Sequence, residues 1–245
     1  MKRYGLIGRT LTHSFSKTYF AKKFAEENIP GCSYENFELK TINEFPLLLS
    51  SNPDIRGLNI TIPYKEEVLQ FLTEKNEVVE AIGACNCIKV EDVKLVGYNT
   101  DAIGFRKALE PQLKPHHKKA LILGTGGASK AINYVLKELG IEYQLVSRRK
   151  EEGQCSYGDI DEDILDDHHL IVNTTPLGMY PNVNAAPPVP YQFLTNKHFL
   201  FDVIYNPAKT KFLAEGEKQG AQISNGYEML IYQAEESWRI WSGNV

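Results

Sequence analysis

The sequence predicts an α/β protein built from two domains. Strand-like and helix-like patterns alternate from the N-terminus, and a continuous apolar run meets a glycine-rich turn near the middle of the chain. A length of 245 residues, 42% of them hydrophobic, is sufficient for two modest cores. We expect residues 1–101 together with 225–245 to form one α/β domain, and residues 102–224 to form a Rossmann-like domain.

The first domain is predicted from alternating runs of β-type residues and helical periodicities. Tyr19, Phe20 and Phe24 have helical spacing, for example, and Pro63 suits the first turn of a helix. Strands are expected at 4–7, 33–39, 55–60, 84–90 and 94–98, and helices at 16–27, 44–49 and 64–72.

The second domain is predicted from the run Ala120 to Leu123, which is apolar throughout, as buried parallel strands are. The helix that follows is closed by Gly140, and an earlier helix ends before Pro111. Further strands are expected at 143–147, 170–173 and 199–203, and helices at 102–109, 130–139 and 226–241.

Composition excludes several classes of protein. A net charge of -4 gives no electrostatic reason to expect nucleic acid or an anionic membrane as a partner. The four cysteines are too sparse for a disulfide framework, and the histidine doublets lack metal-ligand spacing, so no metal is expected. The short apolar run at the N-terminus does not resemble a signal peptide, and no later stretch reaches transmembrane length. We therefore expect a cytoplasmic protein.

The glycine-rich turn predicts a dinucleotide site. Gly124 permits a tight turn between strand and helix, and Gly126 lets the backbone approach a pyrophosphate at the helix start. The next strand ends in the basic run Ser147 to Lys150, with no carboxylate to bind a ribose 2′-hydroxyl, which favours NADP over NAD. The alternatives are a tight turn that binds nothing and a solvated basic loop.

Polar residues follow the strands of the first domain. Asn59 and Thr61 share one face of a strand by the period of two. Lys65 is expected in the first turn of a helix, where a cation opposes the helix dipole, and Asn86 is expected at the start of a strand. Asp101 stands at the junction of the two domains, where ligand clefts commonly form.

Eight segments of the chain resemble the shikimate dehydrogenases, in the order of that family and along essentially the whole length. They are HSFS at 13–16, NITIPYK at 59–65, GACN at 83–86, NTDAIG at 99–104, GTGGA at 124–128, NTTPLGM at 173–179, DVIYNP at 202–207 and NGYEMLIYQA at 225–234. The resemblance implies NADP-dependent, reversible reduction of 3-dehydroshikimate to shikimate, in chorismate and aromatic amino-acid biosynthesis, by a monomer or homodimer.

The resemblance also implies roles for individual residues. Lys65 and Asp101 are implied as the catalytic pair. The implied substrate-binding residues are Ser14, Ser16, Asn59, Thr61, Asn86, Tyr205 and Gln233. The implied cofactor-binding residues are Gly124, Gly126, Gly127, Ala128, Ser147, Arg148, Arg149, Thr174, Met179 and Gly226.

Plainer interpretations stay open for several of these residues. Lys65 is interpretable as a surface lysine and Gln233 as an exposed helix residue. Asp101 suits a helix N-cap, and so do Ser14 and Ser16. A quinate/shikimate dehydrogenase with relaxed cofactor use is the nearest alternative function, and a non-catalytic NADP-binding sensor is an alternative of another class.

The chain departs from the family pattern at a few positions. Lys17 replaces a usual proline, and Cys87 replaces a usual threonine. The stretch from Lys150 to Asp167 is short for the family. We expect it to hold a strand at 155–159 and a remnant helix at 161–165.

Overall fold

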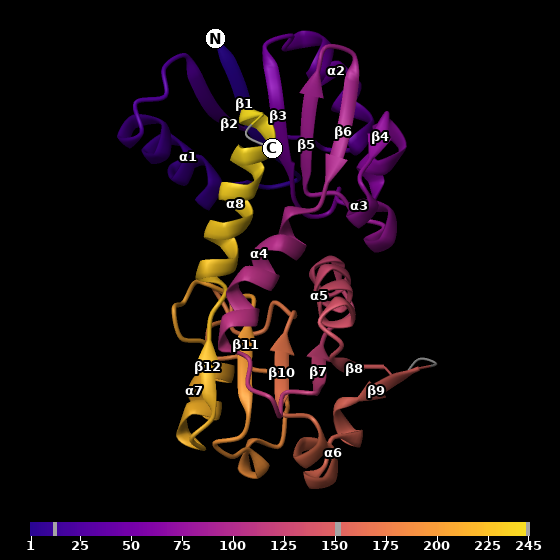
Figure 1. Ribbon diagram of the computed structural model, residues 1–245, viewed down its shortest axis with the longest axis vertical. Coiled ribbons are helices and arrows are strands. Elements are labelled where there is room, and N and C mark those ends of the chain that lie inside the picture. Colours follow the sequence, from indigo (N-terminus) through magenta and orange to yellow (C-terminus); the bar gives the residue numbers. More distant parts are fainter. Residues whose placement is uncertain (12–13, 150–152, 244–245) are drawn as a thin grey trace. The chain divides into compact units, whose positions relative to one another are not determined.

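The computed structural model describes residues 1–11, 14–149 and 153–243. Two compact units divide the chain: unit 1 is residues 1–100 with 234–245, and unit 2 is residues 101–233. The first break lies beside the expected one, whereas the second lies inside the last helix (Figure 1). His13 of the first family-like segment and Lys150 of the basic run are outside the described residues.

Unit 1 contains a mixed sheet, which the described strands form in the order β2-β1-β3-β5-β6-β4. Its strands are β1 (Lys2–Gly8), β2 (Cys32–Glu38), β3 (Ile55–Ile60), β4 (Glu74–Lys75), β5 (Cys87–Glu91) and β6 (Lys94–Tyr98). Strand β1 is parallel to β2 and β3, whereas β5 is antiparallel to β3 and β6. Because β1 and β3 are parallel, the residues that follow their carboxyl ends lie at the same edge of the sheet.

Helices α1 (Phe15–Glu26), α2 (Phe45–Ser51) and α3 (Glu77–Ile82) belong to unit 1, together with the end of α8 (Tyr227–Ser242). The end of α8 is part of the unit 1 core. The Trp241 ring stacks on Tyr4 at 5.1 Å, and its Nε1 donates a hydrogen bond to the Ile88 carbonyl (3.0 Å). A side chain at Gly57 would overlap this indole, so glycine is needed there.

Unit 2 contains a parallel sheet, whose described strands follow the order β12-β11-β10-β7-β8-β9. They are β7 (Lys119–Leu123), β8 (Glu142–Ser147), β9 (Gln154–Ser156), β10 (Leu170–Asn173), β11 (Phe199–Asp202) and β12 (Gln222–Ser224). The order reverses between β7 and β10. In sheets of this kind, ligands bind at the carboxyl edge beside such a reversal. The predicted α/β class is confirmed.

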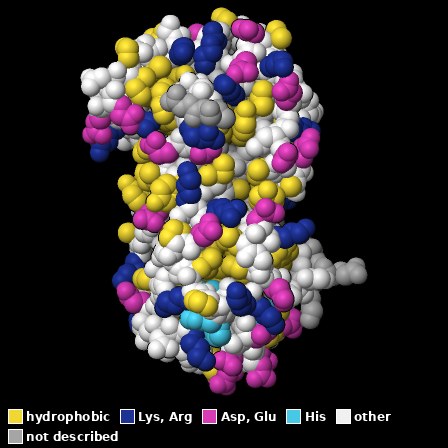
Figure 2. All heavy atoms as spheres, viewed as in Figure 1, with side chains coloured by type: hydrophobic (Ala, Val, Ile, Leu, Met, Phe, Trp, Pro, Cys, Tyr) yellow, Lys and Arg dark blue, Asp and Glu magenta, His cyan; other side chains and the backbone are white. Residues whose placement is uncertain are grey.

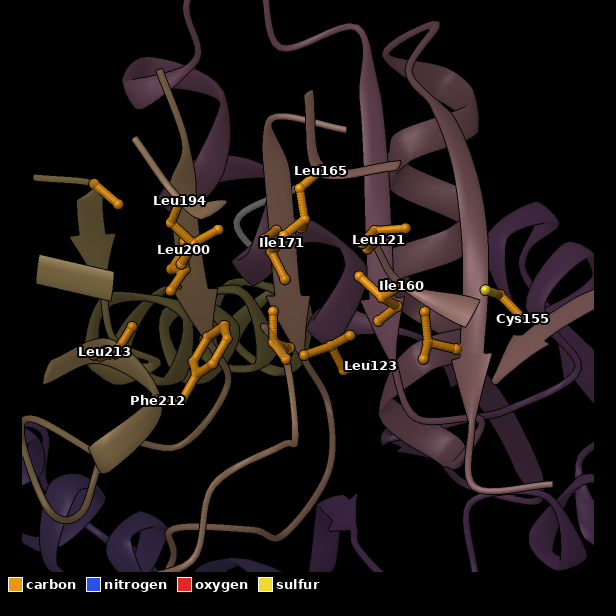
Figure 3. Close-up of a cluster of buried hydrophobic side chains, with 13 residues drawn as sticks. Leu121, Leu123, Cys155, Ile160, Leu165, Ile171, Leu194, Leu200, Phe212 and Leu213 are labelled. Atoms are coloured by element: carbon orange, nitrogen blue, oxygen red, sulfur yellow. The ribbon is translucent and has the colours of Figure 1, made fainter. Parts of the chain in front are cut away.

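Helices α4 (Thr100–Leu109), α5 (Gly127–Glu138), α6 (Glu162–Asp167) and α7 (Lys211–Lys218) complete unit 2, with the start of α8. Leu121, Ile171 and Leu200 project from adjacent strands into one apolar layer, in which Phe212 of α7 also lies (Figure 3). This core fixes the strands whose carboxyl ends carry the predicted cofactor residues. No helix in the described part of the chain combines the length and apolarity that a membrane span requires.

The helix predicted at 64–72 is wrong. Residues 62–66 form turns, and only Glu67–Phe71 form a short 3₁₀ helix. The carbonyl of Lys65, which an α-helix would pair with a residue four positions later, instead accepts the N–H of Cys85 (2.8 Å). A contact with a distant segment thus replaces the local helical bond. Strand β5 also begins later than expected, at Cys87.

Candidate active site

The predicted site residues divide between the two units. Unit 1 holds Ser14, Ser16, Asn59, Thr61, Lys65 and Asn86. Unit 2 holds Asp101, Tyr205 and Gln233, together with all the predicted cofactor-binding residues.

Ser14 and Ser16 lie at the start of α1. The Oγ of Ser14 caps this helix by accepting the N–H of Lys17 (3.2 Å), and Ser16 is 9% exposed in the first turn. A serine hydroxyl that accepts one hydrogen bond still has its own proton to donate. The capping role of Ser14 is therefore compatible with binding an anion at the same helix start.

Asn59 and Asn86 are buried side by side, at the end of β3 and just before β5. The Nδ2 of Asn59 donates to the Asn86 carbonyl (3.2 Å), and the Oδ1 of Asn59 accepts from the hydroxyl of Tyr34 (2.9 Å). Asn86 accepts the backbone N–H of Thr100 (2.6 Å) with its own Oδ1. Tyr34 and Thr100 were not singled out by the sequence, although both bind predicted site residues.

Thr61 and Lys65 lie beyond the end of β3, and both are half-buried. The N–H of Thr61 donates to the Ile7 carbonyl (2.8 Å), which extends the pairing of β3 with β1 by one residue. The sequence predicted Lys65 in the first turn of a helix, where its ammonium would oppose the helix dipole. Lys65 is in a turn instead, so this opposition does not arise. The pairing of its carbonyl with Cys85 fixes the backbone from which this side chain extends.

Asp101 is the second residue of α4 and is half-buried. It lies inside the first helical turn, so it does not hold the N-cap position that precedes the helix. A carboxylate in a first turn is favoured by the positive end of the helix dipole. The bond from the Thr100 N–H to Asn86 fixes the residue before it.

The glycine-rich turn leaves β7 with Gly124 at φ +110°. This backbone conformation favours glycine, and a Cβ at that position would also lie 2.7 Å from the Thr174 Oγ1. Thr174 follows β10, and its N–H and hydroxyl both donate to the Leu123 carbonyl (2.9 and 2.8 Å). Gly124 and Thr174 are thus in contact at the point where the strand order reverses.

Helix α5 begins directly after this turn, with Gly126 at its N-cap. Gly126 and Gly127 are exposed, and a Cβ placed on either would meet no protein atom within 4 Å. Ser129, which replaces a usual glycine or alanine, is 2% exposed and donates its hydroxyl to the Gly126 carbonyl (2.6 Å). The backbone at Gly126 and Gly127 therefore has open space beside it at the start of α5, where a bound anion is favoured.

Ser147 ends β8, and Arg148 and Arg149 follow it at the same edge of the sheet. The Ser147 hydroxyl donates to the Arg149 carbonyl, which fixes the turn, and both arginines are exposed. On the face of the molecule in Figure 2, basic and acidic side chains are interspersed. Two exposed guanidinium groups at neighbouring positions, Arg148 and Arg149, provide a local positive charge that suits a phosphate.

Tyr205 and Gly226 belong to adjacent segments of unit 2. The N–H of Gly226 donates to the Ile204 carbonyl (3.1 Å), and a side chain at Gly226 would overlap the Val203 carbonyl. Tyr205 is half-buried, burial raises its pKa, and its ring lines a hollow of about 580 Å³ in unit 2.

The other two predicted residues differ in exposure. Met179 is 48% exposed in a turn after β10, where its N–H donates to the Pro176 carbonyl (3.2 Å). Gln233 is 8% exposed and donates to the Leu230 carbonyl (2.9 Å). The interpretation of Gln233 as an exposed helix residue is therefore wrong.

Asp202, at the end of β11, is a buried carboxylate that the sequence analysis missed. Its oxygens accept hydrogen bonds from Asn173 Nδ2 (3.1 Å), the Ile204 N–H (3.0 Å) and the Thr210 hydroxyl (2.6 Å). Burial raises the pKa of Asp202 to about 6, against the effect of these donors. Asp202 joins the end of β10 to the segment that follows β11. A carboxylate one residue before the end of the strand predicted at 199–203 was the available signal.

Comparison with known proteins covers both units. Residues 6–88 match the family model of the shikimate dehydrogenase substrate binding domain. The shikimate dehydrogenase (NADP(+)) of Caldicellulosiruptor bescii is 40% identical, over 98% of this chain and 89% of its own.

Two solved structures are also similar. Shikimate 5-dehydrogenase of Thermus thermophilus, in complex with NADP(H) and shikimate, has a TM-score of 0.87 and 28% identity, over 99% of this chain and 94% of its own. Quinate dehydrogenase of Corynebacterium glutamicum, in complex with NAD, has a TM-score of 0.88 and 26% identity, over the same shares.

Proposed function

Because the chain belongs to the shikimate dehydrogenase family, we propose that it catalyses the NADP-dependent, reversible reduction of 3-dehydroshikimate to shikimate. One observation carries this proposal beyond family membership. The glycine turn at the reversal of the parallel sheet and the polar residues at the edge of the mixed sheet are both present in one chain.

We assign most of the substrate contacts to unit 1, because the match to a substrate binding domain falls within it, and we add Tyr205 and Gln233 of unit 2. Ser14 and Ser16 would hold the substrate carboxylate with their hydroxyl protons, and Thr61, Asn86, Tyr205 and Gln233 would bind the ring hydroxyls and carboxylate. Both ends of the Asn59 amide bind protein groups: Oδ1 accepts from the Tyr34 hydroxyl, and Nδ2 donates to the Asn86 carbonyl and to the Ser237 Oγ. We therefore place Asn59 behind the contacts to the substrate and not among them.

We assign the cofactor to unit 2, whose residues fit NADP. The backbone from Gly124 to Ala128 would hold the pyrophosphate, because the glycines leave open space beside the start of α5. Ser147, Arg148 and Arg149 would hold the 2′-phosphate. Thr174, Met179 and Gly226 would lie toward the ribose and nicotinamide. When bound in its reduced form, the cofactor would supply the hydride for reduction, and in its oxidised form it would accept the hydride in the reverse reaction.

We assign the proton chemistry to Lys65 and Asp101. Negative charge develops on the C3 carbonyl oxygen of the substrate during reduction. The Lys65 ammonium stabilises that charge and then donates the proton, and Asp101 orients Lys65 or the hydroxyl. A non-catalytic sensor would have no need of both residues.

The activity is tested by following the absorbance of reduced nicotinamide with shikimate or quinate, each combined with NADP or NAD. Turnover with shikimate and NADP alone is expected. Turnover with quinate or NAD would instead place the enzyme with the dual-specificity dehydrogenases, to which the similarity with quinate dehydrogenase points. The absence of turnover in all four combinations would refute the proposed activity.

The catalytic assignment is tested with Lys65→Ala. We expect turnover to fall by about three orders of magnitude or more, with the affinity for NADP, measured by calorimetry, nearly unchanged. Lys22→Ala is the control, because Lys22 is an exposed lysine of α1 paired with Glu26. Substantial turnover in Lys65→Ala would refute the catalytic role.

We also propose a cytoplasmic location. All four cysteines are free thiols, and three of them are buried. Proteins of oxidising compartments more often use cysteines in disulfides.

A further inference from the structure

A chain of buried hydrogen bonds links the substrate-side residues of unit 1. It ends at Asn86, to which we assign a substrate contact. Its inner members are Tyr34, Asn59, Ser237 and Thr100. Tyr34 and Ser237 are absent from the residues that the sequence implied, and each bonds to at least one residue that it did imply.

Tyr34 is held rigidly in β2. Its ring is 6% exposed and stacks on Phe20, with centroids 4.5 Å apart and an interplanar angle of 14°. Burial raises the pKa of Tyr34, and a hydrogen bond with Ser16 acts in the opposite direction. The Tyr34 hydroxyl donates to the Oδ1 of Asn59 (2.9 Å).

Ser237 of α8 is fully buried and completes the other half of the chain. Its Oγ accepts from Asn59 Nδ2 (2.9 Å) and lies 3.2 Å from the Thr100 Oγ1. The Thr100 Oγ1 in turn accepts from Asn86 Nδ2 (3.0 Å). A hydroxyl of the last helix thus reaches the amide that precedes β5.

These bonds determine which way each amide faces. A side-chain amide turned by 180° exchanges its donor for its acceptor, which would reverse its hydrogen bonds to a hydroxyl of the substrate. The backbone N–H of Thr100 can only donate, so Oδ1 of Asn86 must face it. Nδ2 of Asn86 then has one hydrogen for Thr100 and a second for a substrate hydroxyl.

We propose that Tyr34 and Ser237 are positioning residues, which hold Asn86, through Asn59 and Thr100, in the orientation that binds shikimate. This inference rests on the proposed function. It predicts that either hydroxyl can be removed with little change in fold but with a loss of substrate affinity.

The test uses Tyr34→Phe and Ser237→Ala, each of which deletes one hydroxyl. Removing the Tyr34 hydroxyl leaves the buried Oδ1 of Asn59 without this donor, and removing that of Ser237 deprives Asn59 Nδ2 and Thr100 of a partner. We expect KM for shikimate and its calorimetric Kd to rise about tenfold in each variant, with KM for NADP changed less than about twofold. Circular dichroism at the assay temperature verifies that each variant is folded.

Tyr191→Phe is the matched control, because the Tyr191 hydroxyl of unit 2 donates to the backbone carbonyl of Pro187 (2.8 Å). It removes one hydroxyl from a half-buried tyrosine and is expected to leave KM for shikimate unchanged. A lower Tm in Tyr34→Phe and Ser237→Ala, with unchanged shikimate KM and Kd, would show a purely structural role and overturn the inference. If the wild-type protein neither binds nor oxidises shikimate, the proposed function fails first and the inference fails with it.

Discussion

Acid is expected to destabilise unit 2 through His117, which lies before β7 and is 3% exposed. Its Nδ1 accepts the N–H of Lys114 (3.0 Å), so Nε2 carries the proton that is donated to the Lys197 carbonyl (3.2 Å). A second proton would have to enter on Nδ1, against the Lys114 N–H. Burial lowers the pKa of His117 to about 4, while the bond to the Lys197 carbonyl acts in the opposite direction.

The magnitude follows from the difference between the folded and unfolded pKa values of His117. The unfolded chain takes up the proton as pH falls through about 6.5, whereas the folded protein resists it down to about 4. The stabilisation by neutral His117 is therefore complete above pH 6.5 and is lost progressively between these values. At pH 5 the loss amounts to about 2 kcal/mol.

The assay is urea unfolding followed by far-UV circular dichroism at pH 7.5 and pH 5.0, for the wild type and His117→Asn. Asparagine does not titrate, so the free energy of unfolding of the variant should lose about 2 kcal/mol less than that of the wild type between the two pH values. Other titrating groups cancel in this comparison. Both tryptophans belong to unit 1. Their fluorescence therefore reports the unfolding of unit 1, which does not contain His117.

His116→Asn is the matched control. His116 is exposed, its ring also contacts the Lys197 carbonyl (3.0 Å), and it lies against the rings of His117 and His169. This variant should keep the wild-type difference between pH 7.5 and pH 5.0. An equal loss of stability in the wild type and His117→Asn would refute the reasoning.

Three further predictions concern stability. Gly226→Ala is expected to lower the free energy of unfolding by about 2 kcal/mol or more, because the new methyl group meets the Val203 carbonyl. Thermal melting would measure this loss. The methyl group of the control, Gly126→Ala, would point into open space, so this variant should keep the wild-type Tm while its KM for NADP rises. Because the folded pKa of Asp202 is raised, its ionisation costs stability as pH rises from about 4 to about 6. The difference in unfolding free energy, Asp202→Asn minus wild type, should then increase by about 1 kcal/mol between pH 5.0 and pH 7.5 in urea titrations, and a constant difference would contradict the assignment. Trp241→Ala is expected to lower the free energy of unfolding by about 3–5 kcal/mol in urea titrations at pH 7.5, because it leaves a cavity in a packed aromatic cluster. A loss below about 1 kcal/mol would show that the surrounding side chains fill this cavity.

Local patterns explain which parts of the fold were predictable. Strand β10 begins and ends at the predicted residues, because its apolar residues are consecutive and buried. Helices α3 and α7 were missed, although Asn76 and Thr210 cap them by accepting the N–H groups of Val79 (2.9 Å) and Leu213 (3.4 Å). Both helices are short, and single caps are too common in sequences to predict a helix alone.

Most of the predicted site residues lie within a family-like segment, whereas Ser147, Arg148 and Arg149 were predicted from a basic run at the end of a strand. Tyr34 and Ser237 meet Asn59 across 25 and 178 positions of the chain, so no spacing in the sequence indicates these bonds. The pairing of Lys65 with Cys85 was hidden for the same reason, since helical periodicity describes only neighbours along the chain.

The discontinuity of unit 1 has a consequence for synthesis on the ribosome. Domains commonly fold in the order in which they emerge, but here residues 101–233 emerge before Trp241 can reach Tyr4, Phe20 and the Ile88 carbonyl. The contiguous unit 2 can complete its core while the first hundred residues still lack the part of their core that α8 supplies. The N-terminal segment of the nascent chain thus has to wait for residues made last, and during that interval its exposed aromatic side chains are available to chaperones.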